Sequence, residues 1–375
     1  MYKTLPGGLP ARTFLARHWQ KQPLLVRQAI PGFAGVLEPS ALIAMACSDE
    51  VESRLVIGAG RQWKLRHGPF TRADFRRLPA RDWTLLVQGV NLHDDAAAAL
   101  LQRFDFLPHS RLDDLMVSYA VPGGSVGPHF DAYDVFLLQG AGRRRWKIGR
   151  QDDLELMPSA PLKILKRFRP EGDATLDGGD MLYLPPRFAH HGIAVTDCTT
   201  WSIGYRAPAF QELASRFLAD FSDRIVLPGQ YADPDLGPTN HPGRIGGGLI
   251  AATEAVLART RWRRRDVTDF LGRYLTEPKP HVFFDPPAQR VAAGAAIERI
   301  RRNGTSLDRR SLMLYSATAA YMNGEEYRFP RGVPPVLQEL SDRRRLAPQA
   351  LPAPVATLLY EWWSAGFVRL PAMPR

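Results

Sequence analysis

The sequence predicts a mainly β protein with α-helical additions, in which a sandwich or barrel of short strands precedes helices and a small α+β module. Between residues 113 and 206, short segments rich in Val, Leu, Phe, Tyr and Trp alternate with Gly, Pro and Asp turns, as in all-β folds. The 32 prolines and 31 glycines favour many turns over a helical bundle. After residue 208 the pattern changes to amphipathic helical segments.

The length of 375 residues suits two or three domains, and 45% hydrophobic with 23% charged residues is typical of a globular protein. The two cysteines have no paired spacing, which argues against a disulfide framework or a thiolate zinc site. We expect a cytoplasmic protein without a membrane partner, because neither a signal peptide nor a membrane-spanning run is present. The net charge of +11 favours polyanionic surroundings.

Local patterns justify the elements before residue 208. Residues 11–30 predict a helix that leads into a strand, and residues 40–50 and 94–104 predict helices. A helical or loop insert is expected near residues 151–160. Strands of the β region are expected at LMVSYAV, DVFLLQG, RRRWKIG, DMLYLPP and TTWSIGY.

Beyond residue 208, residues 209–226 predict an amphipathic helix and residues 249–276 predict further helices. A hairpin is expected over residues 312–329, with Asn323-Gly324 as its two-residue turn. An apolar stripe on the first of these helices forms either core within the chain or a dimer seam. Its members are Phe210, Leu213, Phe217 and Phe221.

Two elements within the β region predict a metal site. The first is residues 127–131, where His129 and Asp131 are two positions apart and point to the same side of an extended strand. The second is residues 179–190, which predict a turn, a short strand, a proline-fixed bend and then His190. Two histidines and one carboxylate form the facial triad of non-haem iron(II) enzymes, which leaves three coordination positions free.

Two alternatives compete with this ligand set. His93-Asp94-Asp95 repeats the His-x-Asp pattern, but it leads into an alanine-rich helix, where its side chains would not converge. His191 competes with His190, and because adjacent strand residues face opposite ways, only one of them can reach the metal. The spacing after the two prolines favours His190.

A strand between the two metal elements carries three consecutive arginines. Arg144 is expected to face the interior, opposite to Arg143 and Arg145, which suit a solvated strand face. An unpaired buried guanidinium is costly unless an anion arrives, and the arginine fork suits a carboxylate. We therefore expect Arg144 to bind the far carboxylate of 2-oxoglutarate, in a pocket that Ser118 and Thr200 would complete, although both also suit ordinary strand positions.

These residues carry a resemblance to a known family. Residues 14–30, 118–149 and 178–195 resemble the JmjC-type ribosomal oxygenases, and specifically the bacterial ribosomal protein arginine hydroxylases. The resemblance implies a double-stranded β-helix (JmjC/cupin) catalytic domain over residues 1–208. It further implies a helical dimerisation region over 209–284 and a winged-helix-like domain over 285–375.

The resemblance also implies the chemistry. The family's iron ligands correspond to His129, Asp131 and His190, and its basic 2-oxoglutarate residue corresponds to Arg144. It implies a homodimer that uses iron(II), 2-oxoglutarate and dioxygen to hydroxylate a large-subunit ribosomal protein, at the β-carbon of arginine in bacteria and at histidine in the eukaryotic branch. Arg187 departs from the pattern, because this bend usually has glycine.

Two function hypotheses remain beside this one: a small-molecule oxygenase with the same cofactors, and a cupin-like metal-binding regulatory module without turnover. Basic charge and the extra C-terminal segments favour a macromolecular substrate. Two arginine clusters suit either solvated helix faces, which are commoner, or contact with ribosomal RNA. These clusters are Arg259, Arg261, Arg263, Arg264 and Arg265, beside Trp262 on an expected helix, and Arg343-Arg344-Arg345.

Overall fold

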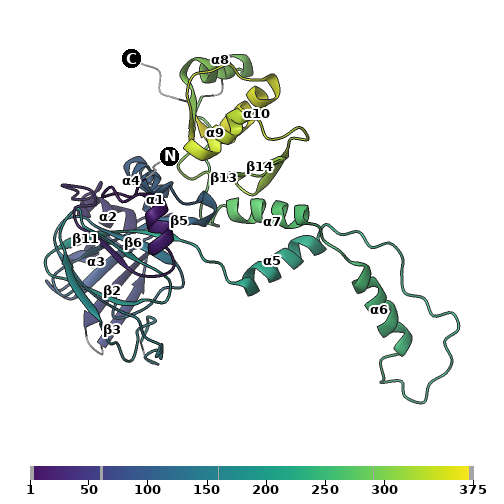
Figure 1. Ribbon diagram of the computed structural model, residues 1–375, viewed down its shortest axis with the longest axis horizontal. Helices are drawn as coiled ribbons and strands as arrows, with labels where there is room; N and C mark the ends of the chain where they lie inside the picture. Colours follow the sequence, from purple (N-terminus) through teal and green to yellow (C-terminus); the bar gives the residue numbers. More distant parts are fainter. Residues whose placement is uncertain (1–3, 60–61, 159, 290, 371–375) are drawn as a thin grey trace. The chain divides into compact units, whose positions relative to one another are not determined.

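The computed structural model describes residues 4–59, 62–158, 160–289 and 291–370. The chain, traced from end to end in Figure 1, divides into two compact units. The first combines Met1–Ala207 with Pro278–Leu312 and Pro334–Arg375, and the second combines Pro208–Glu277 with Met313–Val333. Among the described residues, no helix has both the length and the apolar character that a bilayer crossing requires.

An eight-stranded antiparallel sheet dominates the first unit. Its central strands read as unbroken apolar runs because both faces of the sheet are covered. In spatial order the strands are β1 (Leu24–Val26), β9 (Met181–Leu184), β6 (Asp134–Gln139), β11 (Cys198–Tyr205), β5 (Leu112–Ala120), β4 (Trp83–Val87), β2 (Ser53–Ala59) and β3 (Gln62–His67).

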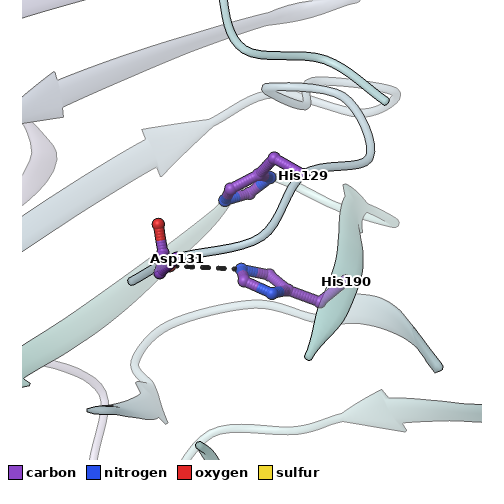
Figure 2. Close-up of side chains that lie close together, drawn as sticks. All are labelled: His129, Asp131 and His190. Carbon is purple, nitrogen blue, oxygen red and sulfur yellow. Dashed lines mark ion pairs between the residues drawn. The ribbon is translucent and has the colours of Figure 1, made fainter. Parts of the chain in front are cut away.

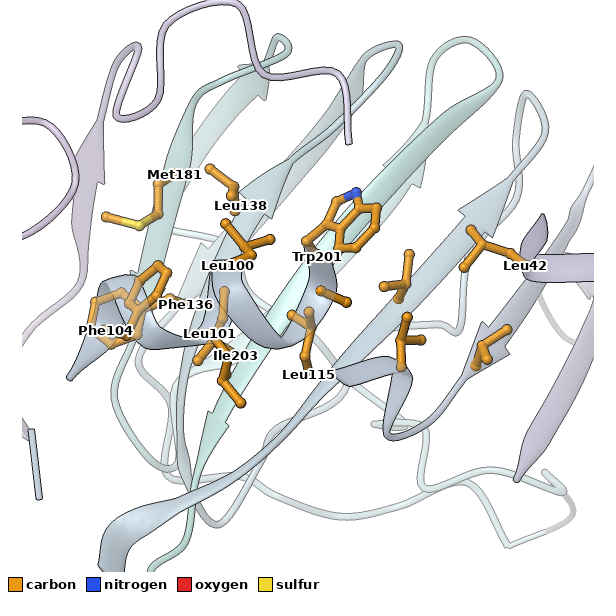
Figure 3. Close-up of a cluster of buried hydrophobic side chains, with 14 of the residues drawn as sticks. Leu42, Leu100, Leu101, Phe104, Leu115, Phe136, Leu138, Met181, Trp201 and Ile203 are labelled. Carbon is orange, nitrogen blue, oxygen red and sulfur yellow. The ribbon is translucent and has the colours of Figure 1, made fainter. Parts of the chain in front are cut away.

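One face of this sheet packs against N-terminal helices and forms the main core (Figure 3). Phe136 of β6 and Trp201 of β11 are fully buried there, together with Leu42 from α2 and Leu100 from α4. Phe14 of α1 packs edge-on against Tyr183 with ring centroids 4.8 Å apart. The short elements around this face are α1 (Ala11–Arg17), α2 (Pro39–Ala46), α3 (Arg72–Arg76), α4 (Asp95–Leu101), and the 3-10 turns Val90–Leu92, Gln102–Phe104 and His109–Arg111.

The opposite face of the large sheet packs against a second, three-stranded antiparallel sheet. This sheet has the order β10 (Ala189–Ala194), β7 (Arg144–Gly149) and β8 (Gly172–Leu176). Val135 and Leu137 alternate with Phe136 along β6, so they point to the second sheet and meet Trp146 and Leu176 there. Two β-sheets that enclose a core confirm the predicted sandwich.

The first unit also contains a small C-terminal module. Its strands β16 (Arg345–Leu346), β12 (Thr305–Leu307) and β17 (Val368–Arg369) form a sheet, and Trp362 and Leu359 of α10 are buried beside it. The accompanying helices are α8 (Ala293–Asn303), α9 (Pro335–Arg343) and α10 (Ala353–Ser364).

The second unit combines helices with the predicted hairpin. Strands β13 (Met313–Tyr315), β14 (Ala319–Met322) and β15 (Glu325–Arg328) form an antiparallel sheet against α7 (Arg264–Thr276). The turn between β14 and β15 is Asn323-Gly324, and its φ values of 51° and 90° are the positive angles that this tight turn needs. Helices α5 (Phe210–Ser222) and α6 (Gly247–Arg259) complete the unit.

Several expectations need correction. Strands β2, β3 and β4 were not anticipated, although the alternation of QWKLRH on β3 carries a strand signal. The insert near residues 151–160, expected as a helix or a loop, is a loop in its described part, with a bridge between Leu156 and Leu165. The arginine cluster around Trp262 does not lie on one helix, because α6 ends at Arg259 and α7 begins at Arg264. The start of α7 is capped by the carboxylate of Asp266, which accepts the N–H of Arg263 at 2.6 Å.

Candidate metal centre

The three predicted metal ligands lie together (Figure 2). Each of His129, Asp131 and His190 offers one ligand atom, and these atoms all lie within 4.8 Å of one another. Nε2 of His190 is 3.6 Å from Oδ2 of Asp131. In the described part of the chain, this is the one group of three or more His, Cys, Asp or Glu side chains arranged to share an ion. The spacing argument therefore selected side chains that converge.

Backbone pairing brings the two histidines together. The N–H of His129 donates to the carbonyl of His190 at 3.0 Å, and the N–H of His190 donates back at 2.8 Å. His190 is the second residue of β10, as predicted, but His129 forms an isolated bridge and lies outside any regular strand. The expected extended strand at residues 127–131 is absent because Gly127 has a φ of 80° and Pro128 lacks an N–H for a ladder.

Both imidazoles present the same nitrogen to the site. Nδ1 of His129 lies 2.9 Å from the carbonyl of Gly127, and Nδ1 of His190 lies 2.9 Å from the carbonyl of Phe188. A carbonyl only accepts, so each Nδ1 carries a proton and donates it. The lone pair of each ring is then on Nε2, which is the nitrogen that a metal requires.

The protonation state also suits a metal ligand. Burial, reinforced by neighbouring His129, lowers the pKa of His190 to about 4, so this imidazole is neutral at pH 7. Two imidazole lone pairs and a carboxylate then face each other across a few ångströms. Three acceptors without a donor between them repel one another unless a cation joins them. The residues therefore fit a divalent metal ion, and two nitrogens with one oxygen are a set that iron(II) accepts.

Arg187 holds the bend before His190 in an unusual conformation. Its φ of 67° lies in the left-handed region, which explains why this position suits glycine. Its N–H donates to the carbonyl of the ligand residue Asp131 at 2.8 Å, so the strained backbone also positions the ligand loop. The arginine side chain is exposed. Arginine at this position therefore adopts the left-handed backbone conformation that glycine adopts more readily.

We expect Arg187→Gly to raise the free energy of unfolding by roughly 0.5–1 kcal/mol, because the relief of left-handed strain exceeds the added entropy of the unfolded chain. Urea unfolding of the metal-free protein measures the change. Arg187→Ala removes the same side chain but keeps the strain, so it should give no gain. An equal gain in both variants would assign the effect to the side chain rather than to the backbone.

Arg144 faces the interior between the two sheets, as predicted. It is 5% exposed, and its Nη1 donates to the hydroxyl of Ser118 at 3.0 Å. Its Nε and Nη2 are buried and have no hydrogen-bond partner in the described part of the chain. Arg143 and Arg145 instead point outward, where they pair with Asp177 at 3.1 Å and Asp173 at 2.8 Å. A buried guanidinium with two free donor nitrogens is suited to a carboxylate.

Ser118 and Thr200 lie directly opposite each other on β5 and β11, and both are buried. The Thr200 hydroxyl donates to Oε1 of Gln139 at 3.2 Å, while Ser118 holds Arg144. Sequence reasoning missed Gln139, which lies on β6 directly opposite Thr200. The region between the sheets is therefore polar near Arg144 and apolar around Leu137.

Sequence reasoning also missed Trp146, which lies close to both the candidate ligand His190 and Arg144. Its ring centroid is 5.8 Å from that of His190, and the Arg144 guanidinium lies 5.9 Å from the ring. Trp146 is two residues after Arg144 on β7, so the alternation that turns Arg144 inward also turns Trp146 inward. That alternation was the available signal.

The rival ligand residues have other contacts. The carboxylate of Asp94 caps α4 by accepting the N–H of Ala97 at 2.8 Å, and Asp95 pairs with Arg309 at 3.0 Å. His93 belongs to no shared-ion group in the described residues. His191 faces Phe168, with ring centroids 6.5 Å apart, rather than the other ligands.

Comparisons with known proteins agree with this architecture. A JmjC domain family matches residues 99–213, and a ROXA-like winged helix family matches residues 259–369. The chain is 43% identical over 234 residues to the ribosomal protein uL16 3-hydroxylase of Escherichia coli, which covers 62% of each protein. It is 38% identical over 239 residues to a probable ribosomal oxygenase of Haemophilus influenzae, covering 62% of this chain and 56% of that protein. The matches thus span less than two thirds of these curated relatives.

Solved structures extend the similarity over nearly the whole chain. The ribosomal oxygenase YcfD from E. coli aligns with a TM-score of 0.82 at 31% identity, covering 99% of this chain and 100% of that one. Another YcfD structure, in complex with cobalt and 2-oxoglutarate, aligns with a TM-score of 0.79 at 30% identity, covering 96% and 97%. The protein therefore belongs to the JmjC-type ribosomal oxygenases, with a JmjC domain and a C-terminal winged helix.

Proposed function

We propose that this protein is an iron(II)- and 2-oxoglutarate-dependent oxygenase that hydroxylates an amino-acid side chain of a large-subunit ribosomal protein. The observation that carries the proposal is the pairing of two features between the same sheets. Three metal-ligand atoms converge within 4.8 Å, and a buried arginine beside them keeps two donor nitrogens without partners. A metal-binding module without turnover has no need for the arginine.

In this proposal His129, Asp131 and His190 hold the metal. The carbonyls of Gly127 and Phe188 fix the two imidazole rings, so the ligands are oriented before the metal binds. Three protein ligands would leave three positions of an octahedral ion for 2-oxoglutarate and dioxygen. The protein would thus orient three ligands and leave the remaining coordination positions free for the reactants.

Arg144 would bind the far carboxylate of 2-oxoglutarate. Ser118 orients the guanidinium through Nη1, so Nε and Nη2 stay available as two donors of the fork. Thr200, directly across from Ser118, would complete the polar end of the pocket, where Gln139 fixes its hydroxyl. The Trp146 ring, packed between the anchor and His190, helps to exclude water from the site.

Bound iron(II) supplies a coupled oxidation: 2-oxoglutarate and dioxygen give succinate and carbon dioxide, and the second oxygen atom is inserted into a substrate C–H bond as a hydroxyl. The protein's own residues bind, orient and desolvate the reactants. The name of the E. coli relative makes uL16 the first substrate to test, and the resemblance to the arginine hydroxylases makes the β-carbon of an arginine the expected position.

The test is succinate release from 2-oxoglutarate with iron(II), with and without purified uL16, followed by mass spectrometry of uL16. We expect release to depend on uL16 and the protein to gain one oxygen atom. Release that responds to metabolites but not to uL16 would replace the proposal by a small-molecule oxygenase. No release under any condition would leave a metal-binding module. Fragmentation of the modified peptide distinguishes arginine from histidine.

We also propose that the protein forms a homodimer through its central helices. No residue of α6 is buried within the chain, and Phe210 of α5 is 90% exposed. Along α6, an exposed apolar stripe follows helical spacing, as expected of an interface. The stripe consists of Leu249, Ile250, Val256 and Leu257. On α5, Phe217 instead packs against Phe270 and Trp262 within the chain.

We expect Leu257→Glu to convert a dimer into a monomer, because a charge in an apolar interface is left without a partner. Light scattering after size-exclusion chromatography measures the mass. Ala255→Glu is the matched control, because it adds the same charge roughly 200° around α6 from Leu257. A dimer that survives Leu257→Glu, or dissociates equally in the control, contradicts the α6 interface.

Three further assignments accompany the proposal. A ribosomal substrate is consistent with a cytoplasmic location. The division into residues 1–208, 209–284 and 285–375 would separate catalysis, dimerisation and the winged helix. Proximity to ribosomal RNA is supported by the net charge of +11.

A further inference from the structure

Three consecutive arginines end one helix of the C-terminal module and line a single cavity. Arg343 is the last residue of α9, Arg344 adopts a left-handed conformation with a φ of 58°, and Arg345 begins β16. In a continuous helix or strand, three successive side chains point to different sides. Here the turn at Arg344 directs all three toward a cavity of about 290 Å³. Arg343 is exposed on the helix, as a solvated face requires, whereas Arg344 and Arg345 lie beyond the helix end and line the cavity with it.

The cavity is strongly positive. Arg309 and Arg369 also line it, and the single carboxylate in its wall is that of Asp95. Asp95 pairs with both, at 3.0 Å to Arg309 and 2.9 Å to Arg369, so one negative charge is shared by two guanidinium groups. Arg369 also pairs with Asp308 at 2.8 Å, outside the lining of this cavity, so the pairs fix both arginines in place while the lining itself keeps an excess of arginine. Five arginines against one aspartate leave a net charge of +4 on the wall.

Few carboxylates contact the remaining arginines of the wall. Arg344 donates to the carbonyls of Asp308 and Arg309, at 2.9 and 3.4 Å, and forms no ion pair in the described part of the chain. Burial lowers the pKa of Arg344 to about 10, so it stays charged at pH 7. Arg345 is exposed and likewise has no ion pair among the described residues, and Arg343 lies 3.7 Å from Glu339 at the surface.

A second cavity of about 530 Å³ shares two lining residues with the first. Arg309 and Arg369 line both cavities, and Arg299 and Arg310 are added in the second. Asp285 and Asp308 also line the second cavity and pair with Arg310 at 3.0 and 2.9 Å, so its four arginines outnumber its carboxylates by two. Nε of Arg299 is buried and unpartnered in the described part of the chain. Two adjoining cavities with common arginines form successive anion sites, which suit a polymer with repeated anionic groups better than a single small anion.

From this arrangement we propose that the arginine-lined cavities bind the phosphodiester backbone of a nucleic acid. Arginine forks hold phosphate oxygens in pairs, and backbone contacts of this kind need no particular base sequence. An acidic peptide is less suited, because Ala98 and Leu307 are the only apolar residues in the smaller cavity, too few to receive peptide side chains. The choice of ribosomal RNA as the nucleic acid rests on the proposed function, but the binding site does not.

The test is fluorescence anisotropy of a labelled single-stranded RNA over a range of salt concentrations. The test variant is Arg343→Glu/Arg345→Glu, which reverses two exposed charges and leaves the half-buried Arg344 in place. The matched control is Arg76→Glu/Arg77→Glu, another adjacent exposed pair in the same compact unit that lines neither cavity. We expect the test pair to weaken binding about tenfold or more and to reduce the log–log salt slope by about 1.4, with little change in the control.

Thermal unfolding of both variants checks that they fold, and hydroxylation of isolated uL16 keeps the two proposals separate. Neither pair contacts the metal ligands, so uL16 turnover should be unchanged. Equal loss of RNA binding in both pairs would overturn the site in favour of general surface charge. Displacement of RNA by polyglutamate as efficiently as by unlabelled RNA would overturn the nucleic-acid assignment.

Discussion

His129→Ala and Asp131→Ala should each lower uL16-dependent succinate release by at least about 100-fold. Loss of hydrogen bonds around a metal ligand already costs 10- to 100-fold in metal affinity or activity, so loss of the ligand itself should cost more. The effect is large because the described cluster has three side chains, with ligand atoms within 4.8 Å of one another, so each substitution removes one third of the protein ligands. Cobalt(II) titration, read from its visible absorption, measures metal binding without turnover.

His191→Ala is the matched control for these variants. It removes a neighbouring imidazole of the same strand whose ring faces Phe168, so metal binding and turnover should stay close to those of the unmodified protein. The control also decides the choice that the sequence left open between His190 and His191. Full activity of purified His129→Ala or Asp131→Ala would end the ligand assignment, and inactivity of His191→Ala with loss of cobalt binding would exchange the two histidines.

Strand alternation explains why much of the candidate site could be predicted. The predicted inward orientation of Arg144, between two outward arginines, holds because β7 is a regular strand paired on both sides. The same rule would have found Trp146. It did not apply at His129, which lies beside Gly127 and Pro128 outside a strand. The spacing of His129 and Asp131 therefore selected two side chains that do converge, although not through the predicted extended strand.

Features that depend on backbone angles or distant contacts could not be read from the sequence. Arginine rarely adopts positive φ, so nothing in the residue type shows that Arg187 keeps the bend that glycine usually forms. The Arg343–Arg345 run looked like a solvated helix face, because its cavity needs Asp95 and Arg369, which are far away along the chain. Local patterns predict elements, but shared cavities depend on the tertiary fold.

Arg144→Met should change stability and co-substrate binding in opposite directions. Two nitrogens of the buried guanidinium have no partner in the described part of the chain, so the apo protein bears a desolvation cost that an apolar side chain removes. Ser118 loses its hydrogen-bond donor in the variant, which offsets part of the gain. We expect the free energy of unfolding without 2-oxoglutarate to rise by about 1 kcal/mol.

The same substitution should raise the KM for 2-oxoglutarate roughly 10- to 100-fold, because hydrogen bonds to a charged carboxylate contribute about 1.5–3 kcal/mol. Cobalt(II) binding should be nearly unchanged, and the thermal stabilisation by 2-oxoglutarate should disappear. Arg144→Lys keeps the charge but loses the planar fork, so its KM for 2-oxoglutarate should lie between those of the unmodified protein and Arg144→Met. Steady-state kinetics and thermal unfolding with and without 2-oxoglutarate measure these effects.

Arg145→Met separates the role of Arg144 from a general loss of positive charge on β7. Arg145 is exposed and paired with Asp173, and exposed pairs of this kind contribute little to stability, so neither the KM nor the apo stability should change much. A structural role for Arg144 predicts a less stable apo protein after Arg144→Met, whereas a role as anion anchor predicts a more stable one. Because the two roles differ in sign, an Arg144→Met protein that is destabilised and has an unchanged KM would remove Arg144 from the co-substrate site.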